Sequence, residues 1–251
     1  MFNFSEEEIP KCMKTTVSIL VAAGSGKRTG FSIPKQWKQI GSSYLFEYSL
    51  RTFISVKIIQ MHFLVVHASE LKQYEKYLRQ KDLLSHVVLV VGGDTRQQSV
   101  FNGLKKIEEF YPRKKLPEFV AIHDVARPLI QRDFIQEVIE TAWHKGAAIA
   151  AAPIFDTVKK VNKSMRIIAT APRQNLFVSQ TPQVFPYKTI LKAHKEAART
   201  KEYVTDDAML FEHRKVPVTI VPNPHPNFKI TTATDFNSAK DYFLRVEKLS
   251  D

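Results

Sequence analysis

The sequence has a single cysteine, Cys12, among its 251 residues. One thiol can form neither a disulfide framework nor a cysteine-based zinc site, and such a composition is typical of a reducing compartment. No apolar run approaches the ~18 residues that a membrane-spanning helix needs. Residues 1–14 lack the basic start and long apolar stretch of a secretory signal, and their three glutamates do not fit a transit peptide. We therefore expect residues 1–14 to be a flexible tail on a cytoplasmic protein.

Two common phosphate-binding signatures are also missing, although residues 22–30 form a glycine-rich stretch, AAGSGKRTG. A P-loop has Ser or Thr after Gly-Lys, but here Arg28 follows Lys27. The dinucleotide fingerprint has a third Gly or Ala where this chain has Thr29, and a helix should follow it directly. Both signatures are therefore excluded for this stretch.

The same stretch nevertheless suits an anionic ligand. Gly24 and Gly26 let the backbone approach a ligand closely, and successive N–H groups in such a turn can surround an anion. Three cations, Lys27, Arg28 and Lys35, suit a polyphosphate because each can neutralise a separate oxygen. Taken alone, the stretch is explained equally well as a glycine turn with solvated basic residues.

The net charge of +12 favours anionic partners, either nucleic acid or small phosphorylated molecules. A nucleic-acid-binding protein concentrates its basic residues on one face or arm and adds aromatic residues for stacking. Here the lysines and arginines are spread from Lys11 to Lys248, and the densest run, residues 113–115, lies between two prolines as a solvated loop would. Charge alone does not decide between the two classes of partner.

Strands and helices alternate along most of the chain. The apolar patterns predict strands at residues 17–21, 58–66, 86–91, 119–122, 147–152, 216–221 and 227–231, and helices at residues 44–53, 69–80, 95–110, 132–143, 186–199, 206–213 and 234–246. This alternation predicts an α/β fold with a doubly wound, mostly parallel, Rossmann-like sheet. Residues 86–91, HVVLVV, are apolar at consecutive positions, which is typical of a strand buried on both faces.

The alternation stops after Pro153. Residues 154–185 contain strand-like pieces and no long helix, and helices resume near residue 186. Such an excursion predicts an extended β-arm, covering about residues 154–177, that pairs with a second subunit. We expect residues 15–251 to form a single domain that carries this arm.

Three unusual loops each follow directly behind a predicted strand: AAGSGKRTG, GGDTRQQS and HDVARP. In a doubly wound sheet, ligands bind at the carboxyl ends of the strands, near a switch point of the topology. The three loops should therefore meet at one edge of the sheet and form one site.

Eight motifs together are similar to one known family: AAGSGKR with a downstream PKQ, then GGDTRQQS, HDVARP, DTVK, an arginine before QTPQ, TDD and NFKIT, in that order. Over residues 15–247 the chain resembles the 2-C-methyl-D-erythritol 4-phosphate cytidylyltransferases, whose sheet is of the nucleotide-diphospho-sugar transferase type. The resemblance implies an enzyme that transfers CMP from CTP to 2-C-methyl-D-erythritol 4-phosphate and releases pyrophosphate, in the non-mevalonate pathway of isoprenoid synthesis. The ribitol-5-phosphate cytidylyltransferases share most of these motifs, so ribitol 5-phosphate or another polyol or sugar phosphate is the alternative acceptor.

The resemblance also implies roles for individual residues. Arg28 and Lys35 would hold the triphosphate as catalytic cations, with Lys27 beside them. The nucleotide would be bound by Ala22, Ala23, Gly24, Gly26, Gly93, Asp94, Arg96 and Ser99, and the acceptor by Asp124, Arg127, Thr157, Arg173, Thr181, Thr205 and Lys229. Because the acceptor phosphate is already anionic near neutral pH, the implied reaction needs no general base.

A cofactor and a quaternary structure follow from the same resemblance. Mg²⁺ would be held mainly by the CTP phosphates, with Asp124 as a candidate protein ligand. In a homodimer, the arm of the neighbouring subunit would supply Thr157 and Arg173, so that the active sites are shared between the subunits. We expect neither a nucleic acid nor a membrane as a partner.

Several of these residues have a second interpretation. His123 could act as a base, but we expect a strand-end histidine bonded to the backbone. Asp206 and Asp207 could form a metal pair, but we expect them to cap the helix that follows, because anionic side chains suit that end. Asp94 could likewise cap the helix at residues 95–110 instead of contacting the nucleoside.

A function from another class also remains open. A basic nucleic-acid- or nucleotide-binding module without catalysis would explain the charge, but not the three strand-end loops together with Arg173 and Lys229. Nucleic-acid binding should weaken steeply with salt and should need no Mg²⁺, which distinguishes such a module from the enzyme.

Overall fold

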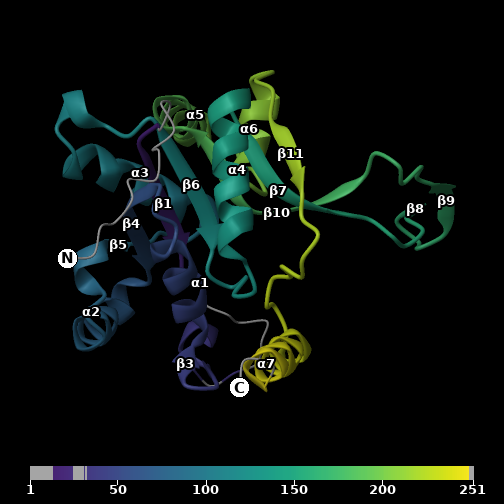
Figure 1. The fold of residues 1–251 in the computed structure, drawn as a ribbon. Coiled ribbons are helices and arrows are strands. Elements are labelled where there is room, and N and C mark those ends of the chain that lie inside the picture. Colours follow the sequence, from purple (N-terminus) through teal and green to yellow (C-terminus); the bar gives the residue numbers. More distant parts are fainter. Residues whose placement is uncertain (1–13, 25–30, 32, 249–251) are drawn as a thin grey trace, which may run out of the picture.

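The computed structural model describes residues 14–24, 31 and 33–248. At its centre lies a seven-stranded sheet with the order β11-β7-β10-β6-β1-β4-β5 (Figure 1). The strands are β1 (Thr16–Val21), β4 (Ile59–Val66), β5 (Val87–Val91), β6 (Phe119–Asp124), β7 (Ala148–Pro153), β10 (Phe177–Pro186) and β11 (Thr219–Pro222). Every neighbouring pair is parallel except the two pairs that β10 makes. The predicted doubly wound, mostly parallel sheet is therefore confirmed.

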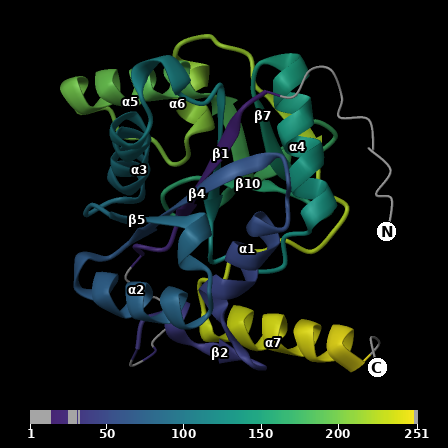
Figure 2. The same cartoon turned by 60° about the vertical axis from the view of Figure 1, so that its left-hand side comes forward.

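Helices cover both faces of this sheet. Six helices form these layers: α1 (Leu45–Ile54), α2 (Leu71–Gln80), α3 (Arg96–Phe110), α4 (Arg132–Lys145), α5 (Tyr187–Thr200) and α6 (Ala208–His213); α7 (Ala233–Lys248) packs elsewhere. The apolar sides of α1, α2 and α4 belong to one core, and those of α3, α5 and α6 belong to a second core across the sheet (Figure 2). Strand β1 shows why two layers form: Val17 and Ile19 face one core, and Leu20 faces the other, as the strand period of two requires. Across the described ranges, no helix has both the length and the apolar character that a bilayer crossing requires.

The position of β5 differs from the expectation. Its run of valines predicted a strand buried on both faces, but β5 is an edge of the sheet, and Val91 is 42% exposed. Val88 and Leu89 are only partly buried. The order of strands depends on the crossover helices and not on the composition of one strand, so a continuous apolar run did not identify a central position.

The structure has a projecting arm where one was predicted. The strand that follows the arm, β10, belongs to the central sheet, and the sequence analysis did not predict this. Strands β8 (Lys159–Val161) and β9 (Ile167–Thr170) form an antiparallel hairpin that projects away from the domain (Figure 1). The chain then returns as β10, which inserts antiparallel between β6 and β7. Residues 227–231, predicted to be a strand, form none; Ile230 instead donates one backbone hydrogen bond to Ala126 O at 2.8 Å.

A small third core attaches α7 to the start of the domain. It contains Ile40, Leu45, Ile230, Phe236 and Ala239, which come from both ends of the sequence. Ile40 belongs to a short ribbon of β2 (Gln39–Ile40) and β3 (Ser43–Tyr44) that follows the glycine-rich loop. The segment behind this loop and the segment before α7 are therefore packed together.

A buried histidine in β4 predicts a dependence of stability on pH. Burial, assisted by nearby His86, lowers the pKa of His62 to about 4, and its Nδ1 lies 2.8 Å from Ser18 Oγ. The folded chain keeps this ring neutral, whereas an unfolded chain protonates it below its ordinary pKa of about 6.5. This lowered pKa therefore costs stability as the pH falls from about 6.5 towards 4, by about 1.4 kcal/mol per pH unit.

Urea unfolding over this pH range, compared with His62→Gln, measures that contribution. The other titrating groups are common to both proteins, so the free energy of unfolding should fall less steeply with acidification in the variant. Equal slopes in the two proteins would contradict a neutral, buried His62.

Candidate active site

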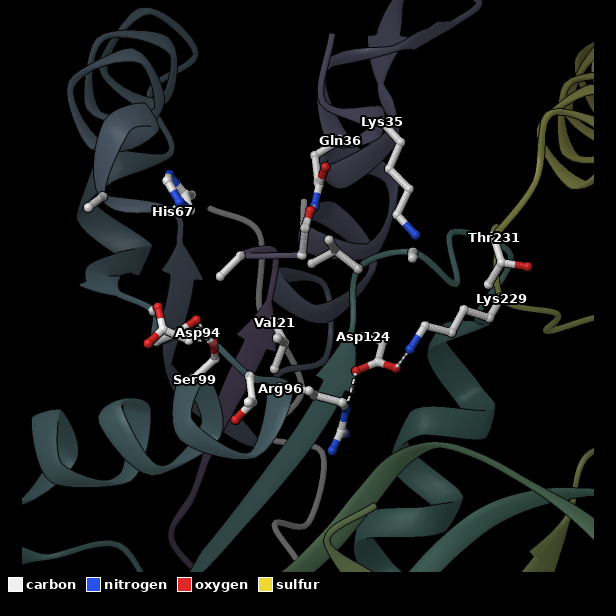
Figure 3. Close-up of a pocket in the computed structure, with 18 residues that line it drawn as sticks. Val21, Lys35, Gln36, His67, Asp94, Arg96, Ser99, Asp124, Lys229 and Thr231 are labelled. Carbon is white, nitrogen blue, oxygen red and sulfur yellow. Dashed lines mark hydrogen bonds and ion pairs between the residues drawn. The ribbon is translucent and has the colours of Figure 1, made fainter. Parts of the chain in front are cut away.

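A cavity of about 660 Å³ opens at the carboxyl ends of β1, β4, β5 and β6 (Figure 3). Its wall contains Ala23 and Gly24 behind β1, His67 behind β4, Gly92 and Gly93 behind β5, and Asp124, Val125 and Ala126 at the end of β6. All three unusual loops therefore contribute to this cavity, as the strand-end argument predicted.

The loop behind β5 is held in shape by the first turn of α3. Gly93 N–H donates to Ser99 Oγ at 3.1 Å, and Asp94 N–H donates to Gln98 Oε1 at 3.1 Å. Thr95 is the N-cap of α3, because its hydroxyl accepts from Gln98 N–H at 3.1 Å. The alternative in which Asp94 caps this helix is wrong, and Asp94 lines the cavity instead.

The residues predicted to bind the nucleotide, or to act on it, have three kinds of location. Ala23, Gly24, Gly93, Asp94, Arg96 and Ser99 line the cavity. Ala22 lies behind it, fully buried, where its N–H donates to Val65 O at 2.7 Å. Gly26 and the predicted catalytic residues Lys27 and Arg28 lie outside the described residues.

Lys35 enters the cavity from a short 3₁₀ helix, η2 (Lys35–Trp37), on the side opposite Arg96 (Figure 3). The side chain is 8% exposed, and its Nζ donates to Ile230 O at 2.6 Å. One of the three predicted catalytic cations is therefore placed in the cavity, next to the segment that carries Lys229.

A second cavity of about 240 Å³ adjoins the first. Arg96, Asp124 and Lys229 line both cavities and so form their common wall. The rest of the smaller cavity is lined by Arg127, Ser179, Gln180, Thr181, Gln183, Thr205 and Asp206. Five of the seven predicted acceptor residues therefore meet here: Asp124, Arg127, Thr181, Thr205 and Lys229.

The common wall is a row of alternating charges. Asp124 accepts from Arg96 Nε at 2.8 Å and from Lys229 Nζ at 2.6 Å (Figure 3). Arg96 Nη1 also reaches Asp207 at 2.8 Å. Burial alone would raise the pKa of Asp124, but Arg96 and Lys229 outweigh it and hold that pKa well below its ordinary value. Burial likewise opposes the charge of Arg96, and the two carboxylates more than compensate, so the net shift of the Arg96 pKa is upward. Asp124 is therefore a carboxylate, and it orients two cations towards the cavities.

The two aspartates of the TDD motif have different environments. Asp206 Oδ1 accepts from Met209 N–H at 3.1 Å and so caps α6, as expected. Asp207 makes no capping bond; it is buried, with His194 Nε2 at 3.0 Å on one oxygen and Arg96 on the other. The expectation of capping is therefore wrong for Asp207, because the partly buried Arg96 offered it a stronger partner than the helix terminus.

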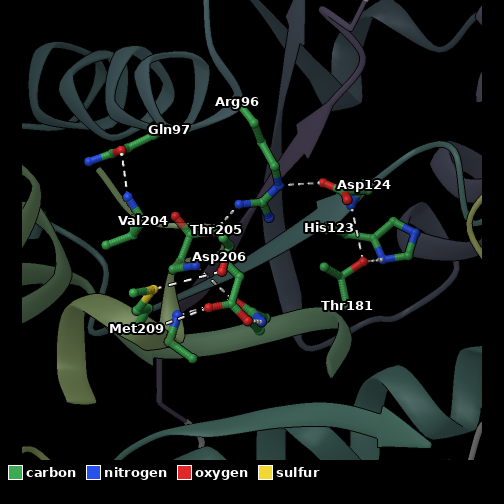
Figure 4. Close-up of polar contacts among 12 residues, drawn as sticks. Arg96, Gln97, His123, Asp124, Thr181, Val204, Thr205, Asp206 and Met209 are labelled. Atoms are coloured by element: carbon green, nitrogen blue, oxygen red, sulfur yellow. Dashed lines mark hydrogen bonds and ion pairs between the residues drawn. The ribbon is translucent and has the colours of Figure 1, made fainter. Parts of the chain in front are cut away.

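His123 is not placed to act as a base. It is fully buried, lines neither cavity, and has its Nδ1 2.9 Å from the hydroxyl of Thr181 (Figure 4). Burial lowers the pKa of His123 to about 3, against the opposing effect of the Asp124 charge. The ring is therefore a neutral structural group, bonded to a side chain of β10.

Thr157 and Arg173 are not brought to either cavity of their own chain. Both lie on the arm, are exposed, and are absent from both cavity walls. The guanidinium of Arg173 donates to Phe155 O within the arm. A role for either residue in this site requires another copy of the chain.

The sequence analysis assigned no site role to several residues that line the cavities, among them two with polar side chains, His67 and Gln36. His67 lies at the end of β4, where the strand-end rule alone could have found it. Gln36 lies within the PKQ motif and is 2% exposed at the cavity wall, but nothing in its spacing indicated a contact.

The donor set bears on the expected metal ion. The described residues contain no group of three or more His, Cys, Asp or Glu side chains that could hold a metal. Asp94 and Asp124 are the carboxylates in the wall of the larger cavity, and both oxygens of Asp124 already accept from cations. This set suits Mg²⁺, which commonly binds one or two carboxylates together with substrate phosphates.

Comparison with known families and proteins gives one consistent result. The family model described as "IspD: 2-C-methyl-D-erythritol 4-phosphate cytidylyltransferase" matches residues 16–245. A protein of that name from Desulforamulus reducens is 38% identical over 234 residues, which cover 93% of this chain and 97% of that protein. A bifunctional enzyme IspD/IspF from Bartonella quintana is 34% identical over 90% of this chain, and the chain spans 57% of that protein's length.

Solved structures agree with the sequence comparisons. The 4-diphosphocytidyl-2C-methyl-D-erythritol synthase of Anaerococcus prevotii has a TM-score of 0.79 at 28% identity, over 92% of this chain and 96% of that one. The 2-C-methyl-D-erythritol 4-phosphate cytidylyltransferase of Thermus thermophilus has a TM-score of 0.71 at 28% identity, over 90% of this chain and 98% of that one. These four relatives are not named for a ribitol phosphate acceptor, so they give no support to that alternative.

Proposed function

The chain belongs to the family of 2-C-methyl-D-erythritol 4-phosphate cytidylyltransferases, and from this we propose that it transfers CMP from CTP to 2-C-methyl-D-erythritol 4-phosphate. The second product is pyrophosphate, and the reaction belongs to the non-mevalonate route of isoprenoid synthesis. The observation that carries the proposal is the pair of adjoining cavities with a common wall of Arg96, Asp124 and Lys229. One cavity can hold a nucleotide while the other holds a smaller phosphorylated acceptor in contact with it.

The reaction needs charge neutralisation more than proton transfer. An oxygen of the acceptor phosphate forms a bond to the α-phosphorus of CTP. The bond from that phosphorus to its bridging oxygen breaks, and the electron pair leaves with pyrophosphate. No proton has to be removed from the attacking oxygen, which agrees with the neutral, buried state of His123. Positioning and electrostatic stabilisation therefore supply the rate enhancement.

The described residues suit these two tasks. Lys35 faces the larger cavity, where it neutralises the triphosphate and the leaving group. Lys229 and Arg127 line the smaller cavity, where they attract the acceptor phosphate. Asp124 holds Arg96 and Lys229 at the boundary, so the two substrates meet beside fixed cations. When bound, Mg²⁺ neutralises further charge on the phosphate oxygens.

Dimerisation through the arm is part of the proposal. The arm and its base expose several large apolar side chains: Phe155 (80%), Met165 (77%), Ile167 (64%), Ile168 (56%) and Val178 (53%). An apolar group of this size on one projection is typical of a protein interface. Thr157 and Arg173 lie on the same arm, so a second copy would carry them into the cavity that lacks them. A cytoplasmic location stays a prediction.

Ile167→Asp tests the arm. A charge in the apolar surface should prevent pairing, so the variant should have the mass of a monomer by light scattering. It should also lose about 10²-fold or more in kcat, because positioning groups of the site are lost. Leu244→Asp, which alters an apolar side chain of similar character on α7 at 37% exposure, is the control. A fully active monomer of Ile167→Asp would contradict shared sites.

The reaction itself is tested by pyrophosphate release from CTP and Mg²⁺, with 2-C-methyl-D-erythritol 4-phosphate and ribitol 5-phosphate offered in parallel. Release with the first acceptor alone is expected. Preference for ribitol 5-phosphate would leave the assignment of the nucleotide cavity intact and would refute 2-C-methyl-D-erythritol 4-phosphate as the acceptor. Release with neither acceptor would overturn the proposed reaction.

A further inference from the structure

The short helix η2 connects three parts of the molecule through three consecutive buried residues. Lys35 bonds to Ile230 O at 2.6 Å, in the segment before α7. Trp37 packs on Tyr74 of α2, with ring centroids 4.5 Å apart. Between them, Gln36 Nε2 donates to Ala22 O at 2.5 Å and to Gly24 O at 2.7 Å. Gln36 received no role from the family resemblance, yet it is the residue of η2 that bonds to Ala22 and Gly24 at the start of the glycine-rich stretch.

The chemistry of these contacts fixes the orientation of the Gln36 amide. Two carbonyl oxygens require two donors, so the NH₂ group must face them, and both of its protons are used. The side chain is 2% exposed, so water does not compete for these bonds. Gln36 Oε1 is buried and has no hydrogen-bond partner within the described part of the chain. Figure 3 shows Gln36 beside Lys35 in the wall of the larger cavity.

The contacts also orient the backbone of the loop. In a trans peptide the C=O and N–H groups point in opposite directions. Because Ala22 O points to Gln36, the N–H of Ala23 points away from Gln36. The contact with Gln36 therefore fixes the direction of this N–H, and a backbone N–H is the kind of donor that an anionic ligand can use.

We propose that Gln36 is a positioning residue for CTP. Its carboxamide holds the backbone of residues 22–24 against η2, and so fixes the distance between these residues and Lys35. A nucleotide that contacts both would bind only when this distance is correct. The inference rests on the proposed function and adds to it a residue that determines nucleotide affinity.

The chain offers a matched control in Gln97. Its side chain also joins a helix to a loop: Nε2 donates to Glu202 O at 3.0 Å, and Oε1 accepts from Val204 N–H at 3.2 Å. Gln97 lines neither cavity. Gln36→Glu and Gln97→Glu therefore make the same chemical change in two glutamines that each bond a helix to a loop. Of the two, Gln36 lines the larger cavity and Gln97 lines neither cavity.

The test is steady-state kinetics of the full chain with both substrates. Gln36→Glu places a carboxylate oxygen against two carbonyl oxygens, so the loop should move away from η2. A displacement of this kind should lower kcat/KM for CTP by about 10²-fold. The KM for CTP should rise by about 10-fold or more, while the KM for the acceptor changes by less than about 3-fold. Gln97→Glu should leave kcat/KM and KM for CTP within about 2-fold of the wild type. Its acceptor KM is not part of this control, because Gln97 bonds to Val204, which precedes Thr205 of the smaller cavity.

A pH profile separates positioning from a general structural defect. Burial against carbonyl oxygens raises the pKa of the introduced carboxyl, and its protonated form can donate one hydrogen bond. The ratio of Gln36→Glu to wild-type kcat/KM should therefore rise towards acid pH, while the Gln97→Glu ratio stays constant. If Gln36→Glu does not fold, Gln36→Met, which keeps the length without the charge, is expected to show the same rise in the KM for CTP.

The outcomes distinguish the two proposals. Equal CTP constants in the Gln36 and Gln97 variants, or a defect confined to the acceptor KM, would overturn the role of Gln36. A wild-type chain that releases no pyrophosphate from CTP would overturn the reaction instead. In that case equilibrium binding of CTP, weakened by Gln36→Glu alone, would still support the positioning role, and equal binding by both variants would refute it.

Discussion

Replacing Lys35 with alanine is expected to lower kcat by about 10²- to 10³-fold, the range found when one preorganised charge-stabilising group is removed. Lys35 lines the larger cavity and is almost fully buried, so its charge acts on the triphosphate with little screening by water. The loss should appear in kcat more than in the KM for CTP, because negative charge on the leaving pyrophosphate develops during the reaction.

Lys38→Ala is the matched control for this experiment. Lys38 follows η2 directly, its Nζ lies 4.6 Å from the ring centre of Phe31, and it lines neither cavity. Its replacement removes the same charge a few residues away and should change kcat by less than about 2-fold. Melting curves show whether either variant loses structure. Wild-type turnover by a folded Lys35→Ala protein would refute the catalytic assignment of this lysine.

Asp124→Asn is expected to lower the free energy of unfolding by about 3 kcal/mol at neutral pH, because it leaves two cations without the carboxylate between them. This value is at the low end for a broken buried pair, since the Lys229 side chain remains 33% exposed and is partly screened. The folded-state pKa of Asp124 is depressed, so its contribution is present above the unfolded pKa of about 3.9 and is lost as the pH falls below it. The difference between wild type and variant should therefore shrink in acid.

The same variant should also raise the KM for the acceptor, because Lys229 and Arg96 lose their orientation at the shared wall. Glu47→Gln provides the comparison: Glu47 is a buried carboxylate on α1, bonded to Arg51 Nε at 2.6 Å, and it lines neither cavity. It should lose stability without a change in either KM. An acceptor KM that is unaltered in Asp124→Asn would show that the row of charges serves the fold alone.

The sequence predicted the location of the site better than its internal contacts. The loops behind β1, β5 and β6 could be assigned to one edge because parallel strands place their carboxyl ends together. The sheet order could not be predicted: β10 enters antiparallel between β6 and β7, and β5 is at the edge, because these positions depend on long-range packing. The TDD motif shows the same limit, since capping and ion pairing are equally compatible with an aspartate before a helix.

The residues that bridge distant segments were the least predictable. Gln36 contacts carbonyls 12 and 14 positions earlier, and Lys229 meets Asp124 across 105 positions. Nothing in a local pattern fixes such pairs. The motif order of the family brought Lys229 into the expected site, but the same motifs left Gln36 without a role.

The third core has a consequence for the time at which the protein becomes competent during its synthesis. Lys35 emerges from the ribosome early, but its carbonyl partner, Ile230, is 195 positions later. At ~5–20 residues per second, translation needs roughly 10–40 s to cover that interval. During this time the nascent chain can pair most of its strands. The cavity, however, still lacks the Lys229 cation, and the third core still lacks the residues that α7 contributes to it. Substrate binding is thus delayed until translation is nearly finished, and a ribosome that stalls before residue 229 holds a sheet without a working site.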